Sequence, residues 1–183
     1  MLLRNNTQHY GWLSIIIHWS MALLIFAMFA LGWLMVELNY GDIWYHKAPW
    51  IHQSVGILLF FLLIFRLFWR LINPLPALYG ATWEKNIGLW VHKSHYVWML
   101  AVICSGYLIS TADGRGIEVF TWFEVPALLA AEKGRESVAG WWHMLLAWCF
   151  MGFVLLHASA AFKHHFIDKD NTLLRMLGIT KDK

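Results

Sequence analysis

Charge-free apolar runs alternate with short polar segments along the whole chain. Each of the four longest runs holds, or nearly holds, the roughly 20 apolar residues that a helix needs to cross a bilayer core about 30 Å thick. The runs without Asp, Glu, Lys or Arg are residues 5–36, 48–65, 94–112 and 137–162. The second span is expected to continue past Arg66, because its long side chain can snorkel. The predicted spans cover about residues 13–36, 48–70, 90–112 and 137–163.

The composition is that of a membrane protein. Of 183 residues, 60% are hydrophobic and 14% are charged, whereas about a quarter of the residues of a soluble domain are charged. No internal repeat or low-complexity segment divides the chain. The predicted fold class is all-α, an integral membrane bundle of four transmembrane helices in a single domain over residues 1–183. We expect membrane lipid around it and no nucleic-acid partner.

The basic residues lie mainly on one side of the predicted membrane. That side holds ten of the fourteen Lys and Arg residues: Arg4, Arg66, Arg70, Lys85, Lys93, Lys163, Lys169, Arg175, Lys181 and Lys183. The positive-inside rule makes this side cytoplasmic, so both termini are expected in the cytoplasm. The opposite side has four basic and seven acidic residues, a formal charge of −3. The outer face is therefore mildly acidic.

The segments that join the spans carry turn and cap signals. The outer connection TADGRGIEVFTWFEVPALLAAEKGRES has apolar stretches that Glu124 and Pro126 interrupt, so it is too short to span a membrane. We expect an interfacial cap with one short helix there. After the fourth span, Asp170 and Asn171 offer caps for a short amphipathic tail helix.

Histidines fall inside the predicted spans, where a polar ring is costly and often functional. His143 and His157 are fourteen residues apart in the fourth span, so a helix places them about 21 Å apart and within about 40° of one face. By depth, His143 pairs with His52, near the outer end of the second span. His157 pairs with His18, near the inner end of the first. Two stacked sites are predicted.

Two neutral imidazoles facing each other in an apolar bundle suit the axial positions of haem iron. Zinc fits less well, because it prefers four ligands, commonly with Cys or carboxylate among them, and none lies in the spans at these depths. Copper would more often recruit Cys or Met. The chain has no C-x-x-C-H motif, so the predicted cofactor is non-covalent haem b. For each ring alone, a hydrogen bond to a backbone carbonyl is the plainer alternative.

The inner pair has a competitor in the third span. His92 and His95 are three residues apart, on one helical face near its cytoplasmic start, and Lys93 between them indicates a wetter position. Spacing alone leaves both His18 and His95 open as the partner of His157.

Several motifs resemble one family over essentially the whole chain. IIIHW around His18, WIHQSVGILL around His52, the His143/His157 pair and the ending KHHFIDKDNTLLRM are similar to the bacterial cytochrome b561 family. In that family, as in the similar cytochrome b subunits of membrane hydrogenases and formate dehydrogenases, the first, second and fourth helices supply the haem ligands. The resemblance implies His18 and His157 for an inner haem b, and His52 and His143 for an outer one.

The resemblance also implies a bacterial inner-membrane protein that passes electrons between the periplasmic side and the quinone pool. The quinone, ubiquinone or menaquinone, also needs protons, and His95, His164 and His165 could exchange them near neutral pH. Of these, His164 and His165 are the favoured quinone-side residues, although for either one alone a solvated helix end is the plainer interpretation. Some members of the family are associated with superoxide oxidation, so superoxide is one candidate for the periplasmic donor.

Other functions are compatible with the sequence. The chain could be the cytochrome b anchor of a larger dehydrogenase, rather than a free-standing quinone-linked oxidoreductase. Intramembrane histidines could instead relay protons or bind a metal in a transporter, or hold helices together in a structural protein. A reducible haem spectrum separates the first class from the other two.

Overall fold

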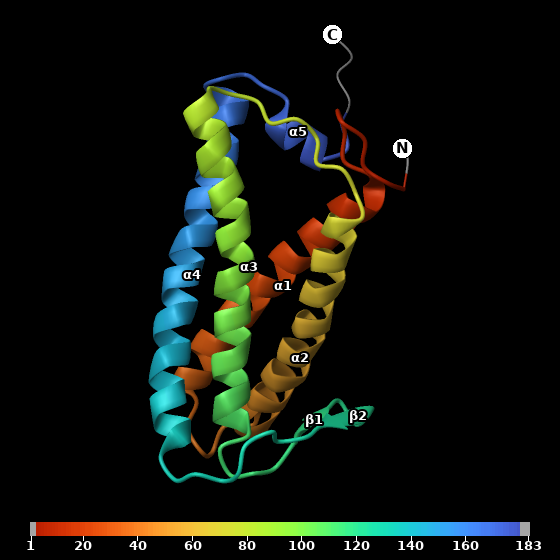
Figure 1. The fold of residues 1–183 in the computed structure, drawn as a ribbon. Helices are drawn as coiled ribbons and strands as arrows, with labels where there is room; N and C mark the ends of the chain where they lie inside the picture. The colour runs from red at the N-terminus through yellow and green to blue at the C-terminus, as the bar shows by residue number, and fades with distance from the viewer. Residues whose placement is uncertain (1–2, 180–183) are drawn as a thin grey trace. The chain divides into compact units, whose positions relative to one another are not determined.

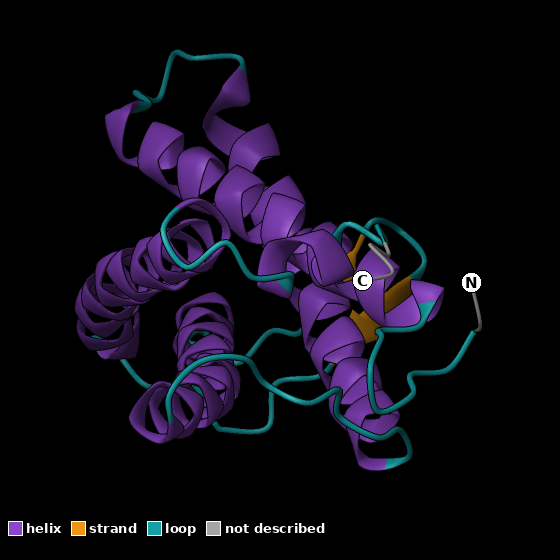
Figure 2. Cartoon of the chain, turned by 90° about the horizontal axis from the view of Figure 1, so that it is seen from above, coloured by secondary structure: helices purple, strands orange, loops and turns teal. Residues whose placement is uncertain are grey.

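Helices make up most of the chain in a computed structural model, which describes residues 3–179. In chain order the elements are α1 (Trp12–Glu37), α2 (Trp44–Leu71), α3 (Thr82–Ser110), β1 (Ile117–Val119), β2 (Phe123–Val125), α4 (Arg135–Phe166) and α5 (Thr172–Met176) (Figure 1). Helix is the prevailing state, and within the described part of the chain the strands are confined to one hairpin (Figure 2). Lys181 and Lys183 of the basic set lie outside the described residues.

Three of the long helices have the length and apolar composition of membrane spans. Among the described residues these are α1, α2 and α4. Helix α3 is equally long at 29 residues, but Glu84, Lys85 and Lys93 in its first half make it more polar. The observed fold is thus mainly helical with three candidate spans.

The expected short helix in the outer connection is wrong. The segment forms two antiparallel strands instead, with Ile117 opposite Val125 and Val119 opposite Phe123. Its triplets IEV and FEV alternate apolar and acidic residues, which is the period of a strand with one buried face. β-branched and aromatic side chains also favour strands over helix. The tail helix α5 does form, and Asn171 is its N-cap residue.

The chain divides into two compact units, and each takes segments from all four long helices. Unit 1 comprises Met1–Ala22, Leu62–Val97 and Met151–Lys183, and unit 2 comprises Leu23–Phe61 and Trp98–Phe150. His18, His92, His95 and His157 all belong to unit 1. Both His52 and His143 belong to unit 2.

In unit 2, the hairpin is fixed to α2 by one buried serine. Ser54 is fully buried, its hydroxyl donates to the Glu118 carbonyl at 3.4 Å, and it accepts the Phe120 N–H at 3.1 Å. Ile57 on the same helix packs with the buried Ile117 and Val119. The hairpin therefore docks on α2 next to the predicted ligand His52.

The hairpin turn uses side chains where glycine is usual. Phe120 and Thr121 both have positive φ, 52° and 86°, a conformation that costs energy, especially for a β-branched residue such as threonine. The Phe120 ring packs edge-on against Trp50, with centroids 5.3 Å apart. Docking on α2 stabilises a turn whose own sequence does not favour it.

In unit 1, a buried arginine joins the tail to two other segments. Arg175 is 6% exposed and donates to the carbonyls of Gln8 at 3.0 Å and Ala77 at 2.9 Å. Its guanidinium also lies 4.5 Å from the Tyr79 ring centroid, within cation–π range. Helix α5 is thereby held against the N-terminal segment and the connection before α3.

Replacing Ser54 with Ala should loosen the hairpin while leaving α2 intact. The substitution leaves the Phe120 N–H and the Glu118 carbonyl without their hydroxyl partner, which costs about 1–3 kcal/mol for buried groups. Amide hydrogen exchange in residues 117–125 of the purified protein should accelerate about tenfold or more.

Ser159→Ala is the matched control, because the exposed Ser159 hydroxyl donates to the Leu155 carbonyl of its own helix, α4. If hairpin exchange is the same in both variants, the serine does not anchor the hairpin.

Candidate functional site

Unit 2 brings two predicted ligands face to face. The His52 ring on α2 and the His143 ring on α4 have centroids 6.1 Å apart and planes inclined by 79°. Both are half-buried. The Nδ1 atom of His52 is buried and has no hydrogen-bond partner among the described residues. This pair therefore has a ring nitrogen whose hydrogen-bonding capacity is not used.

The His143 ring is oriented by α3. Its Nδ1 lies 3.0 Å from the Val102 carbonyl and 3.0 Å from the Ser105 hydroxyl, which itself donates to Val102. A carbonyl only accepts, so the ring proton is assigned to Nδ1. The Nε2 lone pair is then available, which is the tautomer that a metal-bound imidazole needs.

Two glycines give these rings their space. A Cβ on Gly106 of α3 would lie 3.1 Å from His143 Cε1, and a Cβ on Gly32 of α1 would lie 3.3 Å from His52 Cε1. Any larger residue would have to displace a ring. Sequence reasoning missed both glycines, as well as Val102 and Ser105, because only the packing of α1 and α3 against the histidines reveals them.

Unit 1 brings a second pair together, with two more imidazoles beside it. The His18 and His157 centroids are 6.3 Å apart. From α3, His95 and His92 also approach His157, at 4.9 Å and 5.5 Å. Both His18 and His95 therefore lie near His157, so each remains a possible partner for it.

Ring spacing separates these partners. A metal with two imidazoles on opposite sides, at about 2 Å from each nitrogen, requires ring centroids about 6.3 Å apart. The pairs His18–His157 and His52–His143 have this separation, and neither Cys nor carboxylate joins them among the described residues. At 4.9 Å, His95 is too close to His157 to share an iron with it on opposite faces.

The hydrogen bonds near His157 favour His95 rather than His18 as its partner. Arg66 Nη2 lies 3.2 Å from His18 Nδ1, and since guanidinium only donates, the His18 proton is placed on Nε2, the atom that iron would take. His95 Nδ1 instead faces the Val91 carbonyl at 2.7 Å. Ring spacing therefore favours His18, while the hydrogen bonds favour His95, as the partner of His157.

Arg66 also matters in its own right. Besides His18, the described partners of its guanidinium are weak ones. They are the Met21 sulfur at 3.6 Å and the Tyr96 ring at 5.9 Å. Arg70 lies over the same ring at 5.7 Å. Two cations beside the inner pair are suited to an anionic group such as a haem propionate, so the residues present fit haem at this pair too.

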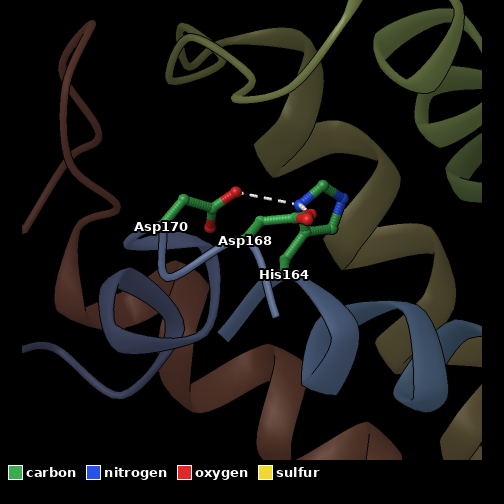
Figure 3. A group of neighbouring side chains, drawn as sticks. All are labelled: His164, Asp168 and Asp170. Atoms are coloured by element: carbon green, nitrogen blue, oxygen red, sulfur yellow. Dashed lines mark hydrogen bonds and ion pairs between the residues drawn. The ribbon is translucent and has the colours of Figure 1, made fainter. Parts of the chain in front are cut away.

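The remaining predicted residues lie in different surroundings. His164 Nδ1 faces the carboxylates of Asp168 and Asp170 (Figure 3), and His165 packs edge-on against Phe166 at 4.7 Å. Among the described ring contacts, none joins His164 to the cluster of His18, His92, His95 and His157.

The chain matches known proteins over most of its length. Residues 9–178 match the family model described as prokaryotic cytochrome b561. Cytochrome b561 homolog 2 of Escherichia coli (strain K12) is 46% identical over 181 residues, which cover 97% of this chain and 96% of that protein. "Probable superoxide oxidase CybB" of Yersinia pestis is 32% identical over 178 residues, covering 93% and 96% of the two chains.

The relatives extend across all four long helices and so across every histidine of both pairs. The family implies haem b as cofactor, and its apolar helices fit a multi-pass protein of the bacterial inner membrane. Paired imidazoles, three apolar helices and the matched length agree with one another. The chain belongs to the prokaryotic cytochrome b561 family of membrane electron-transfer proteins.

Proposed function

We propose that the protein binds two haem b groups and transfers electrons across the inner membrane between an outer donor and the quinone pool. His52 and His143 hold the outer haem, and His18 and His157 the inner one. The observation that carries the proposal is the ring spacing of the two pairs, 6.1 Å and 6.3 Å. Bound haem supplies a reversible one-electron carrier at each pair.

The chain itself contributes the position and orientation of the ligand rings. Val102 and Ser105 fix the tautomer of His143, while Gly32 and Gly106 allow the rings to pack closely. Arg66 and Arg70 offer positive charge beside the inner pair. Because each ligand stands on a long helix, its ring is held by backbone rather than by a loop.

We further propose that α3 crosses the membrane with α1, α2 and α4, that both termini are cytoplasmic, and that residues 1–183 form one di-haem domain. At 29 residues, α3 is about 43 Å long at 1.5 Å per residue, which suffices for a span. Ten of the fourteen basic residues fall on the terminal side under this topology, as the positive-inside rule expects.

The quinone side is proposed to be unit 1. Quinone reduction consumes protons, and His95, His164 and His165 are imidazoles of this unit that are assigned to no haem. The His95 ring contacts His157 at 4.9 Å, so it is the best placed of the three to serve a quinone near the inner haem. Ubiquinone and menaquinone are both compatible with these groups.

The proposed outer donor is superoxide, as in the printed name of the Yersinia pestis relative. Lys47 and His46 are exposed at the start of α2, five and six residues before His52. Arg115 contributes little to attracting an anion, because it bonds Asp113 at 2.6 Å and keeps the pKa of that carboxyl below its usual value. Attraction therefore depends on Lys47.

Haem counting tests the ligand assignment. Purified wild-type protein should contain two haem b per chain by its pyridine haemochrome spectrum, and His52→Ala and His18→Ala should each contain about one. His95→Ala should keep both, since it is assigned no iron. Loss of the inner haem only in His95→Ala would reassign the ligand, and a haem-free wild type would favour the transporter hypothesis.

Adding one methyl group at Gly106 should disturb only the outer haem. Gly106→Ala presses on His143, and overpacking of this kind costs about 1–3 kcal/mol, so outer-haem retention should weaken about fivefold or more. Gly140→Ala on α4 is the control, because a Cβ there meets nothing within 4 Å. Equal haem retention in the two variants would show that the close approach to His143 has no role.

Reversing the charge of Lys47 should slow superoxide consumption. Lys47→Glu replaces attraction of the anion by repulsion and should lower the second-order rate about threefold at low ionic strength, with the effect vanishing at high salt. Lys133→Glu, an equal charge change elsewhere in the outer connection, should leave the rate near that of the wild type. A salt-independent or absent difference between the variants would contradict steering by Lys47.

A further inference from the structure

Three side chains converge where α4 ends. His164 stands in the last turn of α4, and Asp168 and Asp170 lie in the turn that follows. The carboxylates of both aspartates face the His164 ring (Figure 3). The His164 Nδ1 is 3.0 Å from Asp168 Oδ2 and 2.8 Å from Asp170 Oδ2. One atom from each of these residues falls within 4.8 Å of the others.

One hydrogen on His164 Nδ1 cannot make two full hydrogen bonds to the facing carboxylates. An imidazole Nδ1 carries at most one hydrogen, yet here it faces two carboxylate oxygens at hydrogen-bonding distance. Lys169, between the two aspartates, has a positive φ of 55°, and both carboxylates face the same ring nitrogen. A single positive centre among the three atoms would satisfy all of them at once.

The surrounding charge also calls for a cation. Lys163 lies between two carboxylates, 2.7 Å from Glu84 Oε1 and 2.7 Å from Asp168 Oδ2. Apart from His164, this ion-pair network has one lysine against three acids, since Asp170 belongs to it as well. The carboxylates of the network outnumber its lysine by two, an excess of negative charge that favours a cation.

We propose that His164, Asp168 and Asp170 form a binding site for a divalent transition-metal ion such as zinc. One imidazole nitrogen and two carboxylate oxygens are ligands that zinc accepts, and water completes an open site. The observed N–O distances of 3.0 Å and 2.8 Å are shorter than the roughly 3.3 Å between ligands of a tetrahedral ion with bonds of about 2.0–2.1 Å, so the carboxylates move apart slightly when the ion enters. The ion fastens the turn after α4 and the start of α5 to the end of α4.

The side chains are accessible enough for an ion to enter. Their exposed fractions are 18% for His164, 30% for Asp168 and 15% for Asp170. Asp170 is further held in place, because its other oxygen accepts the Thr172 N–H at 2.8 Å. The nitrogen ligand favours zinc over magnesium, which prefers oxygen and retains its water.

Lys163 is the competitor of the metal. Its ammonium already contacts Asp168 Oδ2, the oxygen that would bind the ion, and it must withdraw toward Glu84 when the ion enters. Removing this lysine should therefore strengthen metal binding, an effect that a purely structural ion-pair cluster does not predict.

Zinc titration of the tag-free, haem-loaded protein in detergent, followed calorimetrically, tests the site. The wild type should bind one zinc ion per chain, and Asp170→Asn should bind it at least tenfold more weakly. Lys163→Met should bind it several-fold more tightly. Asp113→Asn is the matched control, because Asp113 is an exposed carboxylate already paired with Arg115. Unchanged haem spectra establish that each variant is folded.

Each other outcome counts against the site. Equal zinc affinity in Asp170→Asn and Asp113→Asn, or weaker binding in Lys163→Met, would overturn it, and so would magnesium binding as tight as zinc. If Asp170→Asn loses its haem spectrum, Asp168→Asn takes its place with the same expected loss. Because zinc binding is measured without donor or quinone, the site can fail while the proposed electron transfer holds.

Discussion

A ring nitrogen of a buried imidazole costs free energy when it has no partner, and the paired histidines of this protein are arranged around that cost. Each ring nitrogen left without a partner in a low-dielectric interior costs free energy. One nitrogen can be served by a backbone carbonyl, as Val102 serves His143. A metal between two facing rings would take one nitrogen of each.

This cost explains features that otherwise have no common cause. A glycine stands against each ring of the outer pair, because close ring packing leaves no room for a Cβ. The hairpin docked on α2 through Ser54, two residues after His52, braces the helix that carries this proposed ligand. At the inner pair, Arg66 serves one nitrogen of His18.

Much of this could be predicted from the sequence, because it depends on patterns within single helices. The long helices followed from charge-free runs, and the pairing of His143 with His52 followed from depth and helical rise. The hairpin was missed, since its strands are only three residues long and one aromatic-rich turn hides their alternation. The choice between His18 and His95 could not be made from spacing in the chain, because it depends on ring separations of 6.3 Å and 4.9 Å across helices.

The low-temperature electron paramagnetic resonance spectrum of the oxidised protein tests the central claim most directly. Iron held by two imidazoles is six-coordinate and low-spin, so two paired sites predict two low-spin ferric signals and no high-spin signal. A high-spin signal in the intact protein, from iron with a single axial imidazole, would contradict the paired arrangement of His18 with His157 and of His52 with His143.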